Sequence, residues 1–326
     1  MQASDLHPAL IAPMQDVEGK VAFITGGDSG IGLGIAQACA AAGMQVVITY
    51  RTTAHRDQAM KVLERAGTAV HAIHVDVTSR EDMAAAAVEA IRVFGKINLL
   101  VNNAGVVSML PLSNTTFDDW DWCMSVNLNG VFNGIRTFLP YIKSHNEGGQ
   151  IVATSSMLGG MIAGPFWGAY SAAKFAVVGM MEALRSELSG SRIGVSVFCP
   201  AGVSSNLDYC DRNRPAELRD IGAPDSETAT MIRDLDKAVE RVIEEHNDPK
   251  ALMDPLEAGE CLLRGVRNND LYIFSHPEYE EMLRERSAAL LASISNSSKP
   301  ASAVRKAMAR IFHNPIYVNE LNHKTL

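Results

Sequence analysis

The amino-acid sequence predicts an α/β fold in which helices cover both faces of a doubly wound parallel sheet. Three observations predict it. Short β-branched segments alternate with longer segments whose apolar residues recur at helical spacing. Several short segments are apolar at consecutive positions, as expected of strands buried on both faces. A glycine-rich segment also joins the first expected strand to the first expected helix.

The expected elements alternate from about residue 20 to about residue 200, which favours right-handed crossovers between parallel strands. Strands are expected at Val21–Thr25, Val46–Tyr50, Ala69–Ile73, Ile97–Val101, Gln150–Thr154, Gly194–Phe198 and, after an interruption, Leu271–Phe274. Helices are expected at Ile31–Ala42, Ala54–Ala66, Arg80–Phe94, Asp118–Ser144 and Tyr170–Leu188.

The alternation stops after residue 200. Residues 204–260 are polar and helix-prone, with a charged amphipathic helix at Asp234–Glu245, so we expect a helical insertion there. It is interpreted as a lid over a substrate, with a peripheral helical insertion as the alternative. The expected organisation is an N-terminal extension at 1–18, one α/β domain at 19–275 and a C-terminal helical extension and tail at 276–326.

The C-terminal extension is expected to hold one helix over 278–294, followed by a flexible linker at Asn296–Ser302. For the remaining residues the sequence leaves two interpretations open: a disordered tail, or an arm onto a neighbouring subunit.

Composition argues against several classes of function. The formal net charge of −8 disfavours nucleic acid and anionic membranes as partners. The five cysteines are scattered and lack a Cys-x-x-Cys pair, which favours reduced thiols over a disulfide framework or a metal site. The N-terminus has no positive flank, and no stretch approaches the roughly 18 apolar residues of a membrane span. We therefore expect a soluble cytoplasmic protein without a metal.

Tyr170 and Lys174 are four residues apart in an expected helix and therefore share one face. A phenol ordinarily loses its proton near pH ~10. An ammonium about 4 Å away is worth roughly 4 kcal/mol at intermediate dielectric, enough to bring the pKa of the phenol towards neutrality. The pair predicts a general acid or base, although the same spacing also occurs on solvated helix faces.

The segment Thr25–Gly32 follows the first strand and opens the first helix. Its glycines at positions 26, 30 and 32 allow a tight turn and a close approach of the backbone to a ligand. Helix N-terminal amides favour a diphosphate there. The terminal Gly-Lys-[Ser/Thr] of a P-loop is absent, which argues against nucleoside triphosphate chemistry.

Polar residues follow the third and fourth expected strands. Asp76 and Val77 come after the third strand, and Asn102–Gly105 after the fourth. Ligands of open α/β sheets bind at the carboxyl ends of strands. Asp76 is interpreted as an acceptor for an adenine amino group, with a helix N-cap as the alternative. For the two asparagines the alternative is turn chemistry.

Taken together, the motifs resemble those of the short-chain dehydrogenase/reductase family. The resemblance rests on Thr25-Gly-Gly-Asp-Ser-Gly-Ile-Gly32, Asp76, Asn102-Asn-Ala-Gly105, Ser155-Ser156, Tyr170-x-x-x-Lys174 and Pro200-Ala-Gly202, in that order. It covers about residues 18–205, and more loosely to 275. It implies a Rossmann-like domain with seven strands, NAD(H) or NADP(H) as cofactor, hydride transfer between an alcohol and a carbonyl, and a homodimer or homotetramer.

The resemblance implies Tyr170 as the catalytic acid or base, and Lys174 as the cation that lowers its pKa and holds the ribose hydroxyls. Ser156 would bind the substrate oxygen. Asn127 would anchor a water behind the lysine, with hydrogen bonding inside a helix as its alternative role. The implied cofactor-binding residues are Gly26, Asp28, Ser29, Gly30, Ile31, Gly32, Arg51, Asp76, Val77, Asn103, Ala104, Gly105, Tyr170, Lys174, Pro200, Gly202 and Val203.

The sequence departs from the family pattern at two places. The catalytic serine lies one residue further from the tyrosine than usual, and alignment of the motif assigns Ser156 over the adjacent Ser155. The family's proline-glycine followed by a carboxamide-binding threonine is replaced by Pro200-Ala-Gly202. Ser204 or Ser205 is the candidate replacement for that threonine.

The end of the second strand favours NADP(H) over NAD(H). No carboxylate stands there to bind a ribose 2′-hydroxyl and repel a 2′-phosphate, and Arg51 is placed to meet that phosphate. Asp28 in the glycine-rich segment weakly favours NAD(H).

Segments that line the pocket in the family are apolar in this chain, which indicates a hydrophobic, aryl-bearing alcohol or ketone as the substrate. Packing between lid and core is the alternative for these residues. A hydroxysteroid is the rival substrate, and a non-catalytic dinucleotide sensor or structural subunit is the rival of another class. The candidate substrate contacts are Ser156, Met157, Phe166, Trp167 and Tyr170.

Overall fold

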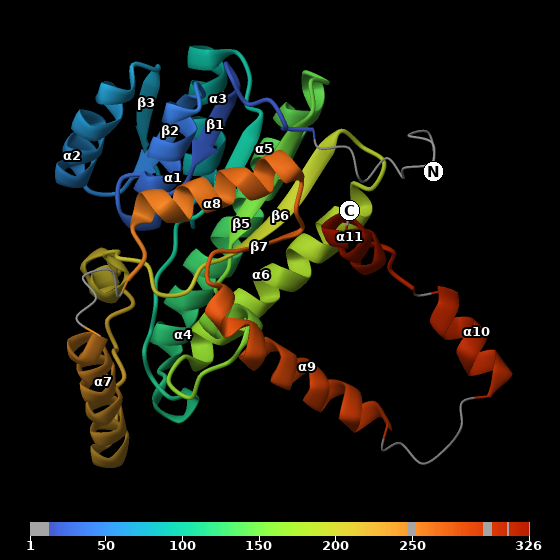
Figure 1. The fold of residues 1–326 in the computed structure, drawn as a ribbon. Coiled ribbons are helices and arrows are strands. Elements are labelled where there is room, and N and C mark those ends of the chain that lie inside the picture. Colours follow the sequence, from blue (N-terminus) through green and yellow to red (C-terminus); the bar gives the residue numbers. More distant parts are fainter. Residues whose placement is uncertain (1–12, 247–251, 296–301, 312, 326) are drawn as a thin grey trace.

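The computed structural model describes residues 13–246, 252–295, 302–311 and 313–325. Its centre is one seven-stranded sheet in the order β3-β2-β1-β4-β5-β6-β7, and each neighbouring pair is parallel (Figure 1). The strands are β1 Val21–Ile24, β2 Gln45–Tyr50, β3 Val70–His74, β4 Leu99–Asn102, β5 Gly149–Thr154, β6 Ile193–Cys199 and β7 Tyr272–Phe274. The predicted doubly wound fold and its strand number are confirmed.

Helices cover both faces of the sheet. Residues of α3, α5 and α6 pack on one face, and residues of α1, α2 and α8 pack on the other. The helices are α1 Gly30–Ala41, α2 Thr53–Leu63, α3 Arg80–Phe94, α4 Phe117–Met124, α5 Gly130–Ser144, α6 Gly168–Glu187, α7 Ser226–His246, α8 Pro255–Asn268, α9 Glu280–Ser295, α10 Ala303–Ile311 and α11 Ile316–Thr325.

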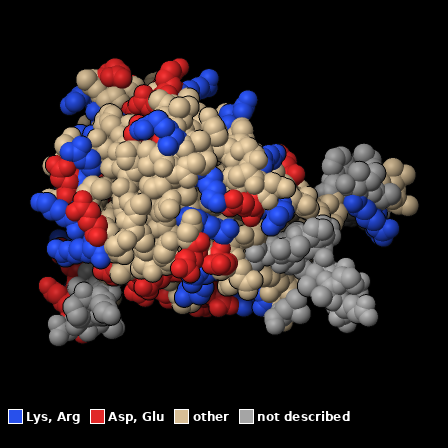
Figure 2. All heavy atoms as spheres, turned by 90° about the horizontal axis from the view of Figure 1, so that it is seen from above, with Lys and Arg blue, Asp and Glu red and all other residues tan. Residues whose placement is uncertain are grey.

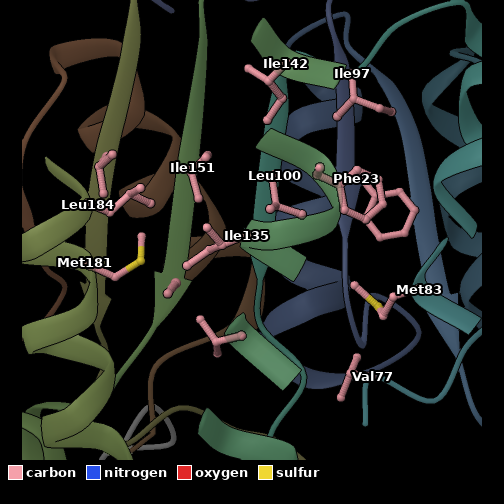
Figure 3. Packing of buried hydrophobic residues seen from close by; sticks show 14 of the residues in the cluster. Phe23, Val77, Met83, Ile97, Leu100, Ile135, Ile142, Ile151, Met181 and Leu184 are labelled. Atoms are coloured by element: carbon pink, nitrogen blue, oxygen red, sulfur yellow. The ribbon is translucent and has the colours of Figure 1, made fainter. Parts of the chain in front are cut away.

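Alternation of side chains along the central strands builds the two cores. On β1, Phe23 faces the helices α3, α5 and α6, whereas Ala22 and Ile24 face α1 and α8. Figure 3 shows Phe23 beside Leu100 of β4 and Ile135 of α5 in the first of these cores. Because both faces of the central strands are buried, their consecutive positions are mostly apolar, which is the pattern seen in the sequence.

The single helix expected over Asp118–Ser144 is interrupted. It consists of α4, a wider π-type turn at Ser125–Asn129, and α5. Such single-turn widenings often lie at functional sites, and this one carries Asn127 into the interior, where its side chain is fully buried.

The interval 204–260 is helical, as expected, but its last residues pack with the core. Met253 pairs with Val203 in an isolated parallel bridge, and α8 begins at Pro255 and packs on α1. Among the described residues, the segment that stands apart from the sheet therefore comprises η7 (Leu207–Asn213), the loop after it and α7.

Two glycines let α1 and α8 cross at very short range. A Cβ on Gly34 would lie 1.8 Å from the carbonyl oxygen of Pro255, and a Cβ on Gly259 would lie 2.3 Å from the carbonyl oxygen of Gly34. No side chain fits between these backbones. The crossing holds the start of α8 against α1. Since α8 follows the insertion, it also fixes where the chain rejoins the core.

In its described part, the C-terminal extension contains three α-helices rather than one. In Figure 1, α9 and α10 project from the body, and α11 returns to α6. Ile316 is buried there, and Glu320 accepts a hydrogen bond from the Leu271 N–H at 3.0 Å. The expected linker at 296–302 lies, except for Ser302, outside the described residues, as do residues 1–12 of the expected N-terminal extension.

Charged side chains of both signs are interspersed on the face in Figure 2, around a largely uncharged centre. None of the described helices is both long enough and apolar enough to cross a bilayer. The five cysteines, all within the described residues, are buried and unpaired.

The crossing of α1 and α8 can be tested by substitution. We expect Gly34→Ala to destabilise the protein by about 1–3 kcal/mol, because the added methyl forces the two helices apart. Chemical unfolding monitored by circular dichroism measures this change.

Gly179→Ala is the matched control, because a Cβ on Gly179 of α6 meets no atom within 4 Å. It should leave stability unchanged or raise it by roughly 0.5–1 kcal/mol, the helix preference for alanine. Equal stability of Gly34→Ala and the wild type would contradict the close crossing.

Candidate active site

One large cavity, of about 640 Å³, lies at the carboxyl ends of the strands. Its size is within the range of small-molecule and cofactor sites. All the residues expected to bind the cofactor line it, together with the four expected catalytic residues. Segments that are far apart in the sequence meet here because the carboxyl ends of parallel strands share one edge of the sheet.

The glycine-rich turn is built to admit a ligand to the N-terminus of α1. Gly26 and Gly30 have φ of 62° and 50°, in the left-handed region that favours glycine. A Cβ on Gly32 would lie 2.0 Å from the Gly26 oxygen, so this position also requires glycine. The first turn of α1 contains no acidic residue. These features fit a dinucleotide whose diphosphate lies at the helix N-terminus.

Thr25 joins the glycine-rich turn to the turn after β4. Its hydroxyl accepts hydrogen bonds from the N–H groups of Asn103 and Ala104 at 2.8 and 3.0 Å. The Asn103 side chain donates back to the Thr25 carbonyl at 3.2 Å. The two cofactor turns are therefore fixed relative to one another by side chains that the motifs contain.

Arg51 is not free, contrary to the expectation that it is available for a phosphate. It forms an ion pair with Asp76, whose second oxygen accepts from the Thr78 N–H and hydroxyl at 2.9 and 2.7 Å. The N-cap of α3 is Ser79 rather than Asp76. Both members of the pair are partly exposed, and such pairs contribute only about 0–1 kcal/mol, so a ligand phosphate could compete for Arg51.

Asp28 is more enclosed than Arg51. Burial raises the pKa of the Asp28 carboxyl, and His55 and Arg212 oppose that rise. The His55 ring nitrogen lies 3.9 Å from the carboxylate. This end of the cavity thus holds two carboxylates facing arginine and histidine side chains, and neither sign of charge dominates.

Lys174 is held on the buried face of α6 beside Tyr170. Its ammonium donates to the Thr154 carbonyl at 2.9 Å and lies 5.6 Å from the centre of the Tyr170 ring. A Cβ on Gly105 would come within 3.5 Å of Lys174 Nζ and 2.9 Å of Asn127 Oδ1. Glycine at 105 therefore leaves these two polar groups exposed to the cavity.

The expected lowering of the Tyr170 pKa is wrong for the protein alone. Burial raises the pKa of Tyr170 to about 12, although a hydrogen bond between Tyr170 and the Ser156 side chain opposes the rise. Burial also lowers the pKa of Lys174 to about 8. The reason is desolvation, which disfavours the charged form of both groups and outweighs the attraction between them.

The two neighbouring serines have separate surroundings. The Ser155 hydroxyl donates to the Lys174 carbonyl at 2.9 Å, inside the packing of β5 on α6. The Ser156 hydroxyl donates to the Leu158 carbonyl and is the group that hydrogen-bonds Tyr170. This geometry supports the assignment of Ser156, rather than Ser155, to the substrate oxygen.

Asn127 joins the catalytic cluster to the cavity wall. Its side chain accepts from the Val106 N–H at 3.1 Å and donates to the Val106 carbonyl at 2.8 Å. Asn127 therefore forms internal hydrogen bonds, which is the alternative role expected for this residue. Asn127 also lines the cavity, so both roles are compatible.

Two of the expected substrate contacts do not reach the cavity. Met157 and Phe166 are 3% and 8% exposed, and neither lines it, whereas Trp167 does. The tight turn after Ser156 presents Leu158 to the cavity instead of Met157. Of the two candidate serines after residue 203, Ser205 lines the cavity and Ser204 does not.

The sequence did not predict the rest of the substrate end, because its residues come from separate segments without a motif. They are Trp122, Leu207, Cys210, Asn213, Pro215, Glu217, Leu218 and Leu252, whereas Met109, which also lines the cavity, belongs to the apolar segment Val106–Leu112 that was expected to do so. Most are apolar, and those from Leu207 to Leu218 belong to the segment that stands apart from the sheet.

A buried ion pair anchors this segment to α4. Arg214 donates to Asp119 at 2.5 Å, both side chains being at most 3% exposed, and its guanidinium lies 4.4 Å from the Trp122 ring centre. The other Asp119 oxygen accepts from the Gly222 N–H at 2.9 Å. Burial raises the pKa of Asp119, but these donors outweigh it, so the net pKa is below the usual range.

Comparison with known proteins shows the family to which this chain belongs. Residues 20–214 match the family described as short chain dehydrogenase. The chain belongs to the short-chain dehydrogenase/reductase family. It is therefore an oxidoreductase of the short-chain type that acts on a CH–OH group, and the family uses NAD(P).

Three similar proteins cover much of the chain. A C alpha-dehydrogenase of Sphingobium sp. (strain NBRC 103272 / SYK-6) is 37% identical over 90% of this chain and 92% of its own. The 3beta-hydroxysteroid dehydrogenase 2 of Eggerthella lenta is 34% identical over 58% of this chain and 73% of its own. The crystal structure of a short chain dehydrogenase/reductase from Burkholderia phymatum in complex with NAD has a TM-score of 0.77, 31% identity, and coverage of 88% and 99%.

The anchor of the insertion can be tested by hydrogen exchange. Arg214→Met leaves the Asp119 carboxylate buried without its cation, which costs about 3–5 kcal/mol. If the penalty opens the segment locally, amide exchange of residues 207–222 should rise by about 100-fold or more.

Lys96→Met is the matched control, since it breaks the partly exposed Lys96–Glu147 pair of 2.7 Å far from the cavity. It should leave the exchange of residues 207–222 as it is in the wild type. Unchanged exchange in Arg214→Met would contradict the proposed anchor.

Proposed function

We propose that the protein interconverts a hydrophobic, aryl-bearing secondary alcohol and its ketone by hydride transfer with a nicotinamide dinucleotide. The observation that carries this proposal is the single cavity that joins the glycine-rich turn to Tyr170, Ser156 and Lys174. A dinucleotide site and an acid/base group in one enclosed space are what this reaction requires.

In the proposed mechanism Tyr170 moves the proton. With its raised pKa the phenol is protonated at neutral pH, so it can donate to a developing alkoxide and accept the proton in the reverse direction. Ser156 hydrogen-bonds the same oxygen and stabilises its negative charge. The Lys174 ammonium adds a positive field. When bound, the dinucleotide supplies or accepts the hydride.

The substrate proposal is supported by the wall of the cavity away from the glycine-rich turn. Trp122, Trp167 and Met109 come from three segments and provide aromatic and polarisable surface. The likeness to a C alpha-dehydrogenase supports oxidation at an alcohol carbon. A hydroxysteroid is the second candidate substrate, supported by the likeness to a 3beta-hydroxysteroid dehydrogenase.

For the cofactor we propose NADP(H) in preference to NAD(H), since β2 ends without a carboxylate and Arg51 lines the cavity. The Arg51–Asp76 pair is weak enough to exchange for a 2′-phosphate. Asp28 and the likeness to a structure in complex with NAD support NAD(H) as the alternative.

A homodimer or homotetramer is proposed as the working form. Support comes from large apolar side chains on α4 and α5 that are exposed in the single chain, Phe117 at 89% and Phe132 at 50%.

Replacement of Tyr170 by phenylalanine tests the proposed reaction. Tyr170→Phe should abolish turnover of a panel of aryl alcohols and ketones, followed by nicotinamide absorbance. It should still bind the dinucleotide, because only the phenolic oxygen is lost. Undiminished activity in this variant would refute the assigned role.

The raised pKa of Tyr170 predicts a dependence on pH. Oxidation needs the phenol to lose its proton, so kcat for alcohol oxidation should climb between pH 6 and 10, towards the pKa of about 12. Reduction needs the protonated phenol and should not gain from alkaline pH. An oxidation rate that is highest below pH 7 would contradict this assignment.

The cofactor preference is tested at Arg51. Arg51→Asp places a carboxylate where NAD-specific enzymes bind the ribose hydroxyls, and it repels a 2′-phosphate. The ratio of kcat/KM for NADP to that for NAD should fall by at least about tenfold. An unchanged ratio would count against Arg51 as the selecting residue.

A further inference from the structure

The pairing of β6 with β7 places a histidine beside the loop that lines the cofactor end of the cavity. The two strands are parallel, and Cys199 of β6 pairs with Phe274 of β7 (Figure 1). Two residues beyond this pair in each segment, Ala201 therefore lies beside His276. Ala201 lines the cavity, whereas His276 is 7% exposed and stands behind the loop.

His276 contacts two peptide units of this loop, Pro200–Ala201 and Gly202–Val203. Its Nδ1 accepts a hydrogen bond from the Ala201 N–H at 3.2 Å, and its Nε2 lies 3.2 Å from the Gly202 carbonyl oxygen. The Ser275 hydroxyl also lies 2.7 Å from Nδ1 and can donate to it. Only the neutral ring with its proton on Nε2 satisfies both backbone contacts, because an imidazolium would set an N–H against the Ala201 N–H.

The same carbonyl is held from a second side. The Met253 N–H donates to the Gly202 oxygen at 3.0 Å, and the Ser204 N–H donates to the Met253 oxygen at 3.0 Å. In a trans peptide the carbonyl and the following N–H point in opposite directions. Fixing the Gly202 oxygen against His276 and Met253 therefore turns the Val203 N–H away from both.

The Val203 N–H is left as an available donor. Among the described residues it has no hydrogen-bond partner, and Val203 lines the cavity. The side chain of Val203 is apolar, so its backbone N–H is the polar group that this residue offers, beside the hydroxyl of Ser205. The orientation of the Gly202–Val203 peptide therefore determines whether this backbone donor faces a ligand.

We propose that His276 is a positioning residue that orients the Pro200–Val203 loop towards the nicotinamide half of the cofactor. The proposal rests on the proposed binding of a nicotinamide dinucleotide. It assigns to His276 no contact with the cofactor itself. Its effect is confined to the half of the dinucleotide nearest Tyr170, because the glycine-rich turn holds the other half independently.

The test compares a whole cofactor with a fragment of it. In His276→Phe the Ala201 N–H and the Gly202 oxygen each lose one partner, while a slightly larger aromatic ring fills the site. The dissociation constant of NADPH or NADH, measured by fluorescence titration, should rise about tenfold. That of ADP-ribose, or of its 2′-phosphate if NADPH binds better, should stay within about twofold when measured by calorimetry.

His276→Asn is the milder second variant, in case His276→Phe folds poorly. Its side-chain oxygen can replace Nδ1 as the acceptor for the Ala201 N–H, and only the contact with Gly202 is lost. The affinity for the reduced dinucleotide should fall between those of the wild type and His276→Phe, with the affinity for ADP-ribose again unchanged. Melting temperatures verify that each variant is folded.

His145→Phe is the matched control. His145 also takes a backbone N–H on Nδ1 (Glu147, 3.2 Å) and contacts a carbonyl through Nε2 (Ile97, 2.9 Å), but at the opposite edge of the sheet. Both affinities should remain those of the wild type in this control.

Equal weakening of the dinucleotide and ADP-ribose in the folded His276 variants, or no weakening of either, would overturn the proposal. Failure of the wild type itself to bind NADPH and NADH would instead refute the proposed function. The two failures are therefore distinguishable.

Discussion

Burial of a phenol and an ammonium on one face of α6 is the constraint on which the proposed site depends. Tyr170 and Lys174 are 8% and 4% exposed, and the low dielectric around them opposes charge on either group. The Thr154 carbonyl stabilises the Lys174 ammonium in this setting by accepting a hydrogen bond from it. The phenol is retained as a proton donor, which suits the reduction of a carbonyl at neutral pH.

The parallel sheet turns this local pair into a site. Each strand ends at the same edge, so the turns after β1, β4, β5 and β6 meet around α6 without any long excursion of the chain. Side chains then fix these turns to one another, as Thr25 does for the turn after β4. The geometry around Tyr170 is therefore a consequence of strand order.

The substrate end is built differently, by a segment that is held through polar anchors instead of strand pairing. Arg214 and Asp119 are buried together against Trp122. Such a buried pair adds little net stability relative to an apolar contact, but breaking it is costly. The pair therefore ties to α4 a segment whose residues Leu207, Cys210, Pro215 and Leu218 line the cavity.

Sequence reasoning located the elements and the shared cavity because both follow from periodicity and from motifs with fixed spacing. It placed the glycine-rich turn, Asp76, Asn127 and the pair on α6 correctly in one cavity. It missed what depends on contacts between distant residues. Examples are the Arg51–Asp76 pair, the burial that shifts the pKa of Tyr170, and the choice of Leu158 over Met157 as a lining residue.

The same limit applies to the insertion and to the loop after β6. Nothing in the order of residues indicated that α8 would cross α1 through Gly34, or that His276 would contact the Ala201–Gly202 backbone. Both depend on how close two backbones come. That distance is set by the whole packed structure rather than by any local pattern.

The most direct measurement is a crystal structure of the protein with its nicotinamide dinucleotide and an aryl alcohol. The account predicts the diphosphate at the N-terminus of α1, and the alcohol oxygen within roughly 2.6–3.2 Å of the Tyr170 hydroxyl. A dinucleotide bound elsewhere, or a Tyr170 ring turned out of the cavity with Lys174 in solvent, would contradict the account.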